Sequence, residues 1–231
     1  MIKLRKLIVS VIAITSLAFS AHSFEGFSVG AVYSSADFST TGNETTDNGD
    51  GTLRNQTTKK NGSADYGSYF GEYTFAQGST LGIEFIPGDA EIGKASRTQT
   101  APATGGADQD GSGLLTAKAT ASDHMTFYFE PTWMMNDKFG VYVKGGASKV
   151  TITPSYTEAA DIIQSTYAAQ DVWGVMTGIG AKMYMGNFFV KVEHVDTEYG
   201  EYAFQSTTGD KNVITADIEQ EATRVALAYN F

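Results

Sequence analysis

The clearest pattern in the chain is an alternation of apolar residues with polar or small ones. In the last segment, one face carries Thr223, Val225, Leu227, Tyr229 and Phe231, and the other carries Arg224, Ala226, Ala228 and Asn230. A period of two is typical of a β-strand with one apolar face. Because the last residues of most domains are frayed and polar, a patterned strand that ends in an aromatic residue needs an explanation.

The same alternation predicts seven earlier strands, separated by two kinds of connection. Three connections are short turns, at 77–79, 136–138 and 186–187. Four are long and polar, at about 39–64, 98–113, 153–169 and 205–216. Pro87 predicts a bend or bulge, and a change of phase after Gly145-Gly146 predicts a second bulge.

Short and long connections therefore alternate strictly along the chain. This order predicts an all-β fold, an eight-stranded antiparallel up-and-down transmembrane β-barrel with short periplasmic turns and long extracellular loops. A soluble β-sandwich is the alternative for the strand pattern, but it gives no reason for loop length to differ between the two ends. Aromatic residues near both ends of the predicted strands, such as Trp133 and Phe188 at one end and Tyr33 and Trp173 at the other, fit membrane interfaces.

The N-terminal segment predicts export. Lys3, Arg5 and Lys6 precede an apolar run from Leu7 to Phe19, and small residues follow it. The run is too short to span a bilayer and is typical of a signal peptide. We expect cleavage after Ser23, with Ser20 as an alternative, so that 1–23 is the signal and 24–231 a single barrel domain.

Composition narrows the class of partner. The chain has 16 Lys and Arg against 26 Asp and Glu, and three of the basic residues lie in the signal. This acidity argues against binding to nucleic acid and to anionic lipid. There are no cysteines, which excludes disulfides and thiolate chemistry.

The face opposite the apolar one carries charges of both signs. Its members are Glu72, Glu84, Glu130, Lys144, Lys182, Lys191, Glu193 and Arg224. Because a lipid-facing Lys or Arg near the midplane would cost roughly 2–4 kcal/mol, these residues are expected to face the lumen and to pair there. His194 and Asp196 have the outward parity, which predicts either a place at the outer interface or a bulge in their strand.

The signal peptide, the strand pattern, the inward charges and the terminal Tyr229-Asn230-Phe231 resemble the small outer-membrane β-barrel superfamily. This group includes the OmpA transmembrane domain, the OmpX/Ail group and the opacity-type surface proteins. The resemblance implies that Val225, Leu227, Tyr229 and Phe231 form the assembly signal read by the barrel-assembly machinery. It also implies interior ion pairs that hold the barrel shut, loops that carry adhesion or related surface activity, and placement in the bacterial outer membrane.

Candidate chemistry is limited. Ser122-Asp123-His124 could supply a hydrolase or acyltransferase site, but consecutive strand residues point to alternating faces, so no catalytic residue is assigned. The acidic segments 47–51 and 108–111 could bind calcium weakly, although turn-forming residues explain them as well. We therefore expect no cofactor and no dedicated metal site.

Three functions follow from these observations. The first is a structural or surface-interaction barrel, monomeric in outer-membrane lipid, that serves adhesion or envelope integrity through an unknown extracellular ligand. The second is a lipid-modifying enzyme, and the third is a small channel. An eight-stranded barrel is just wide enough for its own side chains, so the first function is the one that the sequence favours.

Overall fold

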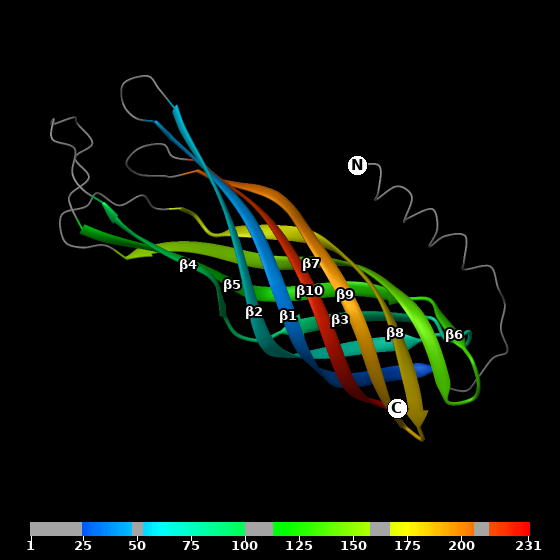
Figure 1. The fold of residues 1–231 in the computed structure, drawn as a ribbon. Coiled ribbons are helices and arrows are strands. Elements are labelled where there is room, and N and C mark those ends of the chain that lie inside the picture. The colour runs from blue at the N-terminus through cyan, green and yellow to red at the C-terminus, as the bar shows by residue number, and fades with distance from the viewer. Residues whose placement is uncertain (1–24, 48–52, 100–112, 158–166, 206–212) are drawn as a thin grey trace, which may run out of the picture.

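The computed structural model describes residues 25–47, 53–99, 113–157, 167–205 and 213–231, and their regular structure is entirely β. The strands are β1 Gly26–Asp47, β2 Leu53–Thr74, β3 Thr80–Ile86, β4 Ala90–Gln99, β5 Gly113–Glu130, β6 Thr132–Met134, β7 Phe139–Thr157, β8 Gln170–Met185, β9 Phe188–Gln205 and β10 Val213–Asn230 (Figure 1). Within these ranges there is no helix of the length and hydrophobicity that would span a membrane.

The strands close into an antiparallel barrel. All of the pairings are antiparallel, and β10 returns to pair with β1, with Val29 opposite Tyr229 and Tyr33 opposite Val225. The backbone N–H of Phe231 donates to the carbonyl of Phe27 at 2.9 Å, which ties the C-terminal end to the start of β1. The predicted eight-stranded up-and-down barrel is confirmed.

Ten segments form eight wall positions because two strands are interrupted. β3 and β4 both pair with β5, and β5 and β6 both pair with β7. Pro87-Gly88 separates β3 from β4, and Pro131 separates β5 from β6. Proline removes a ladder donor, and Gly88 has a φ of 85° that side-chain-bearing residues rarely adopt. The bend predicted at Pro87 is therefore present.

The three short turns lie where the sequence predicts them, at the end of the barrel that also holds Phe231. The first long connection is different. β1 runs to Asp47 and β2 begins at Leu53, so the expectation of a loop over 39–64 is wrong. The two strands stay paired along this stretch, from Ser39 opposite Asn61 to Asp47 opposite Leu53. A backbone ladder needs no apolar side chains, and outside the membrane both of its faces can be polar.

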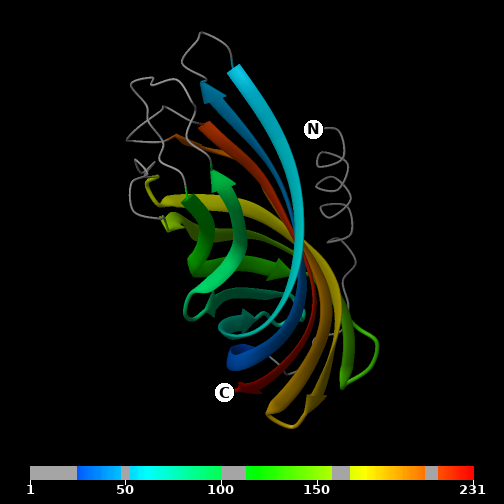
Figure 2. The ribbon, with the colours of Figure 1, turned by 60° about the vertical axis from the view of Figure 1, so that its left-hand side comes forward.

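The strands are much longer than a membrane crossing requires. β1 and β2 have 22 residues each, about 70 Å at the usual rise per residue, whereas a crossing takes about 9–11 residues. The two views show the loop-side halves of β1, β2, β9 and β10 continuing well past the ring formed near the turns (Figures 1 and 2). The barrel therefore has a turn-side half and a raised loop-side half.

The bulge predicted after Gly145-Gly146 is also wrong. β7 pairs with β8 without a shift from Phe139 to Ile152. Val150 and Ile152 are simply inward, 5% and 4% exposed, and they belong to a buried apolar cluster in the loop-side half. Bulges occur instead between Ser122 and Met125, between Glu91 and Gly93, and between Ile218 and Glu219.

Candidate functional site

The turn-side half of the lumen holds a cluster of buried charges. Its eight members come from seven strands: Glu72 on β2, Glu84 on β3, Glu130 on β5, Lys144 on β7, Lys182 on β8, Lys191 and Glu193 on β9, and Arg224 on β10. None of them is more than 5% exposed. We refer to this set as the lumen charge network. The structure thus places all eight inward-parity charges inside the barrel.

The network is continuous from one wall to the other. Lys191 Nζ lies 2.5 Å from Glu72 Oε2 and 2.8 Å from Glu130 Oε2. Glu130 also lies 3.6 Å from Lys182 and 3.2 Å from Lys144, the latter a charge contact without hydrogen-bond alignment. Through Lys144 the network continues to Glu193, Arg224 and Glu84.

Lys144 donates to both oxygens of Glu193, at 3.1 and 3.0 Å. Arg224 bridges the end of the network, because one terminal nitrogen is 3.4 Å from Glu193 and the other pairs with Glu84. Four acidic and four basic groups give the network no formal net charge. Burial of ions is costly unless they are paired and hydrogen-bonded, and here every ion has an opposite neighbour.

Aromatic and hydroxyl groups surround these charges. Tyr128 donates to Glu72 at 2.9 Å, Tyr142 donates to Glu193 at 3.0 Å and Ser68 donates to Glu84 at 2.6 Å. The ammonium of Lys144 also lies 4.0 Å above the centre of the Tyr128 ring, a favourable cation–π position. Side chains thus fill the turn-side lumen.

The loop-side half of the lumen is apolar instead. Its buried cluster comprises Val150, Ile152, Tyr167, Val172, Tyr199, Phe204 and Ile218. Beside the cluster lies a cavity of about 290 Å³, which we call the vestibule cavity. Sequence reasoning missed this site because inward residues were expected to be polar. The reversed parity of Val150 and Ile152 was the available signal, and it was assigned to a bulge.

The barrel wall has an open seam next to this cavity. β2 pairs with β3 from Thr74 to Tyr69, and Tyr69 lies opposite Phe85. Above that point, among the described residues, β2 pairs only with β1, and β4 pairs only with β5. Figure 2 shows β2 (cyan) and β4 (green) diverging toward the loop end. We call this gap in the ladder the β2–β4 seam.

His124 lies in the lining of the vestibule cavity, but it does not form a catalytic triad with Ser122 and Asp123. Its Nε2 is 2.7 Å from the hydroxyl oxygen of Tyr199, and its buried Nδ1 has no hydrogen-bond partner. A general base of the triad type needs an orienting acid on the second nitrogen. Asp123 is exposed and has a φ of 50°, next to the bulge of β5.

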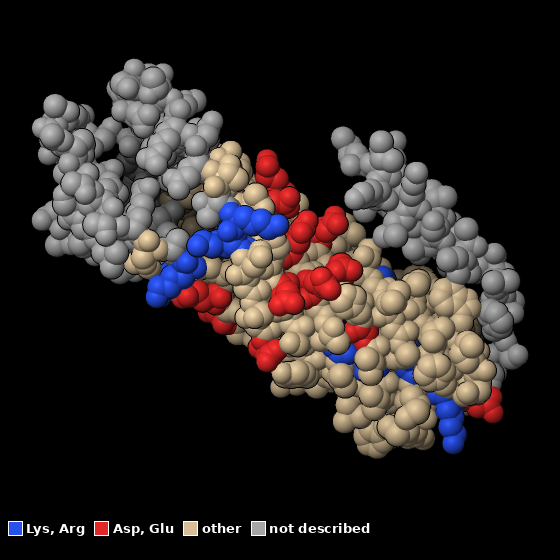
Figure 3. Space-filling view, viewed as in Figure 1, with Lys and Arg blue, Asp and Glu red and all other residues tan. Residues whose placement is uncertain are grey.

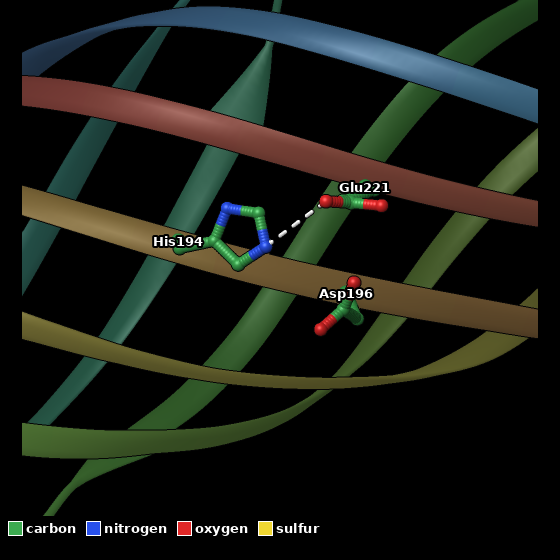
Figure 4. Close-up of side chains that lie close together, drawn as sticks. All are labelled: His194, Asp196 and Glu221. Carbon is green, nitrogen blue, oxygen red and sulfur yellow. Dashed lines mark ion pairs between the residues drawn. The ribbon is translucent and has the colours of Figure 1, made fainter.

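His194 and Asp196 lie on the outer surface, and with Glu221 they form a small polar cluster (Figure 4). Inward and outward residues alternate without interruption from Phe188 to Tyr199, which excludes a bulge there and selects the outer-surface alternative. His194 Nε2 is 3.2 Å from Glu221 Oε1. One donor atom from each of the three residues lies within 4.8 Å of the others, so the cluster could hold a divalent cation.

This cluster borders an acidic groove on the outer face, just beyond the apolar belt. The groove has a volume of about 740 Å³ and is lined by Asp37, Asp196, Glu198, Glu219 and Glu221. Lys59 is the one basic residue among the described residues that line it. Figure 3 shows acidic side chains gathered in the middle of this face, beside the broad, mostly uncharged surface of the turn-side half.

The strand with the proposed assembly signal closes the barrel. Val225, Leu227, Tyr229 and Phe231 all point outward, with exposed fractions between 37% and 72%. The ring of Tyr229 lies 5.1 Å from the rings of Phe188 and Phe231 in edge-to-face contacts. The signal peptide and its cleavage position lie outside the described residues, as do the segments 48–51 and 108–111.

Comparison with known proteins places the fold. No family model matches the chain, and no curated protein matches it. Among solved structures, the outer membrane protein OprG from Pseudomonas aeruginosa matches 94% of this chain and 99% of its own, with 12% identity and a TM-score of 0.57. Neisserial surface protein A (NspA) matches 87% of this chain and 99% of its own, with 10% identity and a TM-score of 0.40.

Ail of Yersinia pestis matches 87% of this chain and 99% of its own, with 12% identity and a TM-score of 0.34. The likeness to OprG shows the fold of the small outer-membrane β-barrels. The closed barrel, its outward apolar belt and the segregation of charge to the lumen agree with that class. The protein therefore has the fold of an outer-membrane β-barrel.

Proposed function

We propose that this protein is a non-conducting surface barrel, whose raised loop-side half contacts an extracellular partner in adhesion or envelope integrity. The observation that carries the proposal is the length of β1 and β2. At 22 residues each, they extend about twice as far as a membrane crossing needs. The excess is paired backbone, which presents a defined surface above the membrane.

The lumen supports the same function and argues against a channel. Eight charges and several aromatic rings occupy the turn-side half, and the ions are paired with one another rather than lining a water-filled path. The acidic groove adds a negative potential outside, which favours encounter with basic surfaces over acidic ones. Attachment through this half should therefore weaken as salt rises.

A shortened hairpin tests the proposal. Thr40 lies opposite Lys60, so residues 41–59 can be replaced by Asn-Gly, a two-residue turn that keeps the ladder in register. The shortened protein should keep its heat-dependent mobility in SDS gels, because the turn-side ring is unchanged. Attachment of cells to a surface, or their resistance to detergent, should fall to the level of the deletion strain.

The matched control is a full-length variant with Ile179→Val, a conservative change at an exposed position of the lipid-facing belt, which should behave as wild type in every assay. Unchanged attachment and detergent resistance in the shortened variant would refute the proposal. A large, steady conductance of the wild type in a planar bilayer would refute it too and would favour the channel. Hydrolysis or acyl transfer on outer-leaflet lipid by the purified protein would favour the enzyme.

A further inference from the structure

The vestibule cavity lies directly behind the β2–β4 seam. Its lining includes Asp65 and Tyr66 from β2 on one side of the seam. On the other side it includes Ile86 at the end of β3, Ala90 at the start of β4 and Pro87 between the two strands. The last paired residues below it, Tyr69 and Phe85, are outward and are 64% and 46% exposed. The seam therefore begins beside outward aromatic side chains, and the outward apolar band of a barrel of this class faces lipid.

The lining is suited to an apolar chain. Its apolar members include Phe38, Ile86, Ile92, Val150, Ile152 and Ile218. The volume of about 290 Å³ lies at the lower end of the range of about 300–1,000 Å³ that is usual for small-molecule sites. This volume suits one alkyl chain and is too small for a whole multi-chain lipid.

The charges of the lining select against an anion. Among the described residues that line the cavity, Asp65, Asp89 and Glu91 are acidic and none is Lys or Arg. A carboxylate or phosphate in this position would face like charges without a counter-ion, which is costly near a surface of reduced polarity. The polar end of an occupant should therefore be uncharged.

One polar atom in the lining has no partner inside the protein. His124 Nδ1 is buried and makes no hydrogen bond, while Nε2 is occupied by Tyr199. A buried polar nitrogen without a hydrogen bond is destabilising, so a ligand that satisfies it gains affinity. A hydroxyl group suits the position in either tautomer, because it can both donate and accept a hydrogen bond.

We propose that the vestibule cavity binds a neutral single-chain lipid alcohol that enters from the outer leaflet through the β2–β4 seam. The alkyl chain lies against Val150, Ile152 and Ile218, and the hydroxyl group pairs with His124 Nδ1. No member of the lumen charge network lines the site. Binding requires no covalent step.

Photolabelling in a bilayer tests the site. The full chain is reconstituted into phospholipid vesicles with decanol that carries a diazirine in its chain, illuminated, digested and analysed by mass spectrometry. Label should concentrate on cavity residues of β7 and β10, such as Ile152 and Ile218, and unlabelled decanol should compete it away. Decanoate at a pH where it is ionised should compete at least about tenfold less well, a difference of about 1.4 kcal/mol.

Matched variants distinguish the cavity from general lipid contact. Ile152 points into the cavity and Thr153, its neighbour, is exposed, so Ile152→Trp should abolish cavity labelling whereas Thr153→Trp should not. Folding of both is verified by mobility in SDS gels. His124→Phe, which fills a similar space without the nitrogen, should retain labelling but need at least about threefold more unlabelled decanol for the same competition, because the hydroxyl group loses its partner.

The outcomes decide the proposal in both directions. Label confined to lipid-facing positions such as Ile83 and Val225, or equal cavity labelling in Ile152→Trp and wild type, would overturn the cavity as a site. Equal competition by decanol and decanoate in the wild type would overturn the assignment to a neutral alcohol. If Ile152→Trp fails to fold, His124→Phe and the positions of label in the wild type still decide it.

Discussion

Lys191 Nζ lies 2.5 Å from Oε2 of Glu72, and the two residues are 119 positions apart in the chain. This contact joins β9 to β2 across the lumen, between strands that share no backbone pairing. The same ammonium bonds Glu130 of β5 at 2.8 Å. One side chain therefore connects three strands of the wall, and its removal should lower the stability of the whole barrel.

Replacing Lys191 should destabilise the barrel strongly. Lys191→Met keeps most of the side-chain volume but leaves Glu72 and Glu130 with one fewer cation in a buried site. Breaking a buried pair typically costs about 3–5 kcal/mol, so the urea midpoint of unfolding in detergent should fall clearly. Lys59→Met, at an exposed position, should have almost no effect. Adding Glu72→Gln to Lys191→Met should restore part of the loss, and full additivity would contradict the pairing.

Two glycines on neighbouring strands should respond oppositely to alanine. A Cβ at Gly82 would overlap the ring of Tyr128, which packs inside the barrel, while a Cβ at Gly71 would meet nothing within 4 Å. Overpacking of a filled core costs about 1–3 kcal/mol, so Gly82→Ala should lower the free energy of unfolding. Gly71→Ala should leave it unchanged or raise it slightly. Equal effects of the two would contradict the filled lumen.

The terminal aromatic residue should control assembly more than stability. Phe231 is 72% exposed on the outer face, whereas Asn230 accepts a hydrogen bond from Ser28 at 2.9 Å. If the last strand is the assembly signal, Phe231→Asp should lower the amount of barrel in the outer-membrane fraction several-fold, measured by immunoblot. Asn230→Ala should reduce it much less. Similar amounts for both variants would count against the signal.

The loop-side surface should show one carboxyl group with a depressed pKa. Hydrogen bonds from Lys149 and Thr151 hold the pKa of Asp171 below its ordinary value of 3.8, and the Lys149 ammonium is 2.7 Å away. Because the folded pKa is the lower one, this contact stabilises the folded state above the ordinary pKa and is lost as pH falls through the folded value.

A carboxyl titration by NMR measures this shift. Lys149→Met should move the pKa of Asp171 back toward 3.8, and Thr151→Val should move it by less. The effect on overall stability should be small, since exposed ion pairs contribute little. An unchanged pKa in Lys149→Met would show that the pair does not persist in solution.

Strand alternation made most of the barrel predictable, because a wall with lipid on one side and packed charges on the other leaves a strong period of two. It predicted the inward parity of Glu130 and Lys182 and the positions of the three turns. The alternation failed to predict structure where the inward and outward faces of a strand are both polar. Beyond the membrane the outer face is polar, so Thr40 and Lys60 carried no signal of the ladder that joins them.

The vestibule cavity was not predictable for a related reason. Val150 and Ile152 are apolar and inward, and an apolar residue in a barrel strand is ordinarily assigned to the lipid face. Only the pairing of β7 with β8 shows that no residue is inserted between Gly146 and Val150. The seam was not predictable either, because it depends on which strands do not pair. The sequence of one strand does not show which strands lie beside it.

The β2–β4 seam also determines how the backbone of this protein should open. On the turn side of Tyr69 the strands form a continuous hydrogen-bonded ring. A backbone amide there can exchange its hydrogen only when the ring opens. Above Tyr69, half of the β2 amides point to an edge with no partner strand among the described residues. Amide hydrogen exchange should therefore divide the molecule in two, with slow exchange from Tyr69 to Thr74 and alternating fast and slow positions from Gly62 to Ser68.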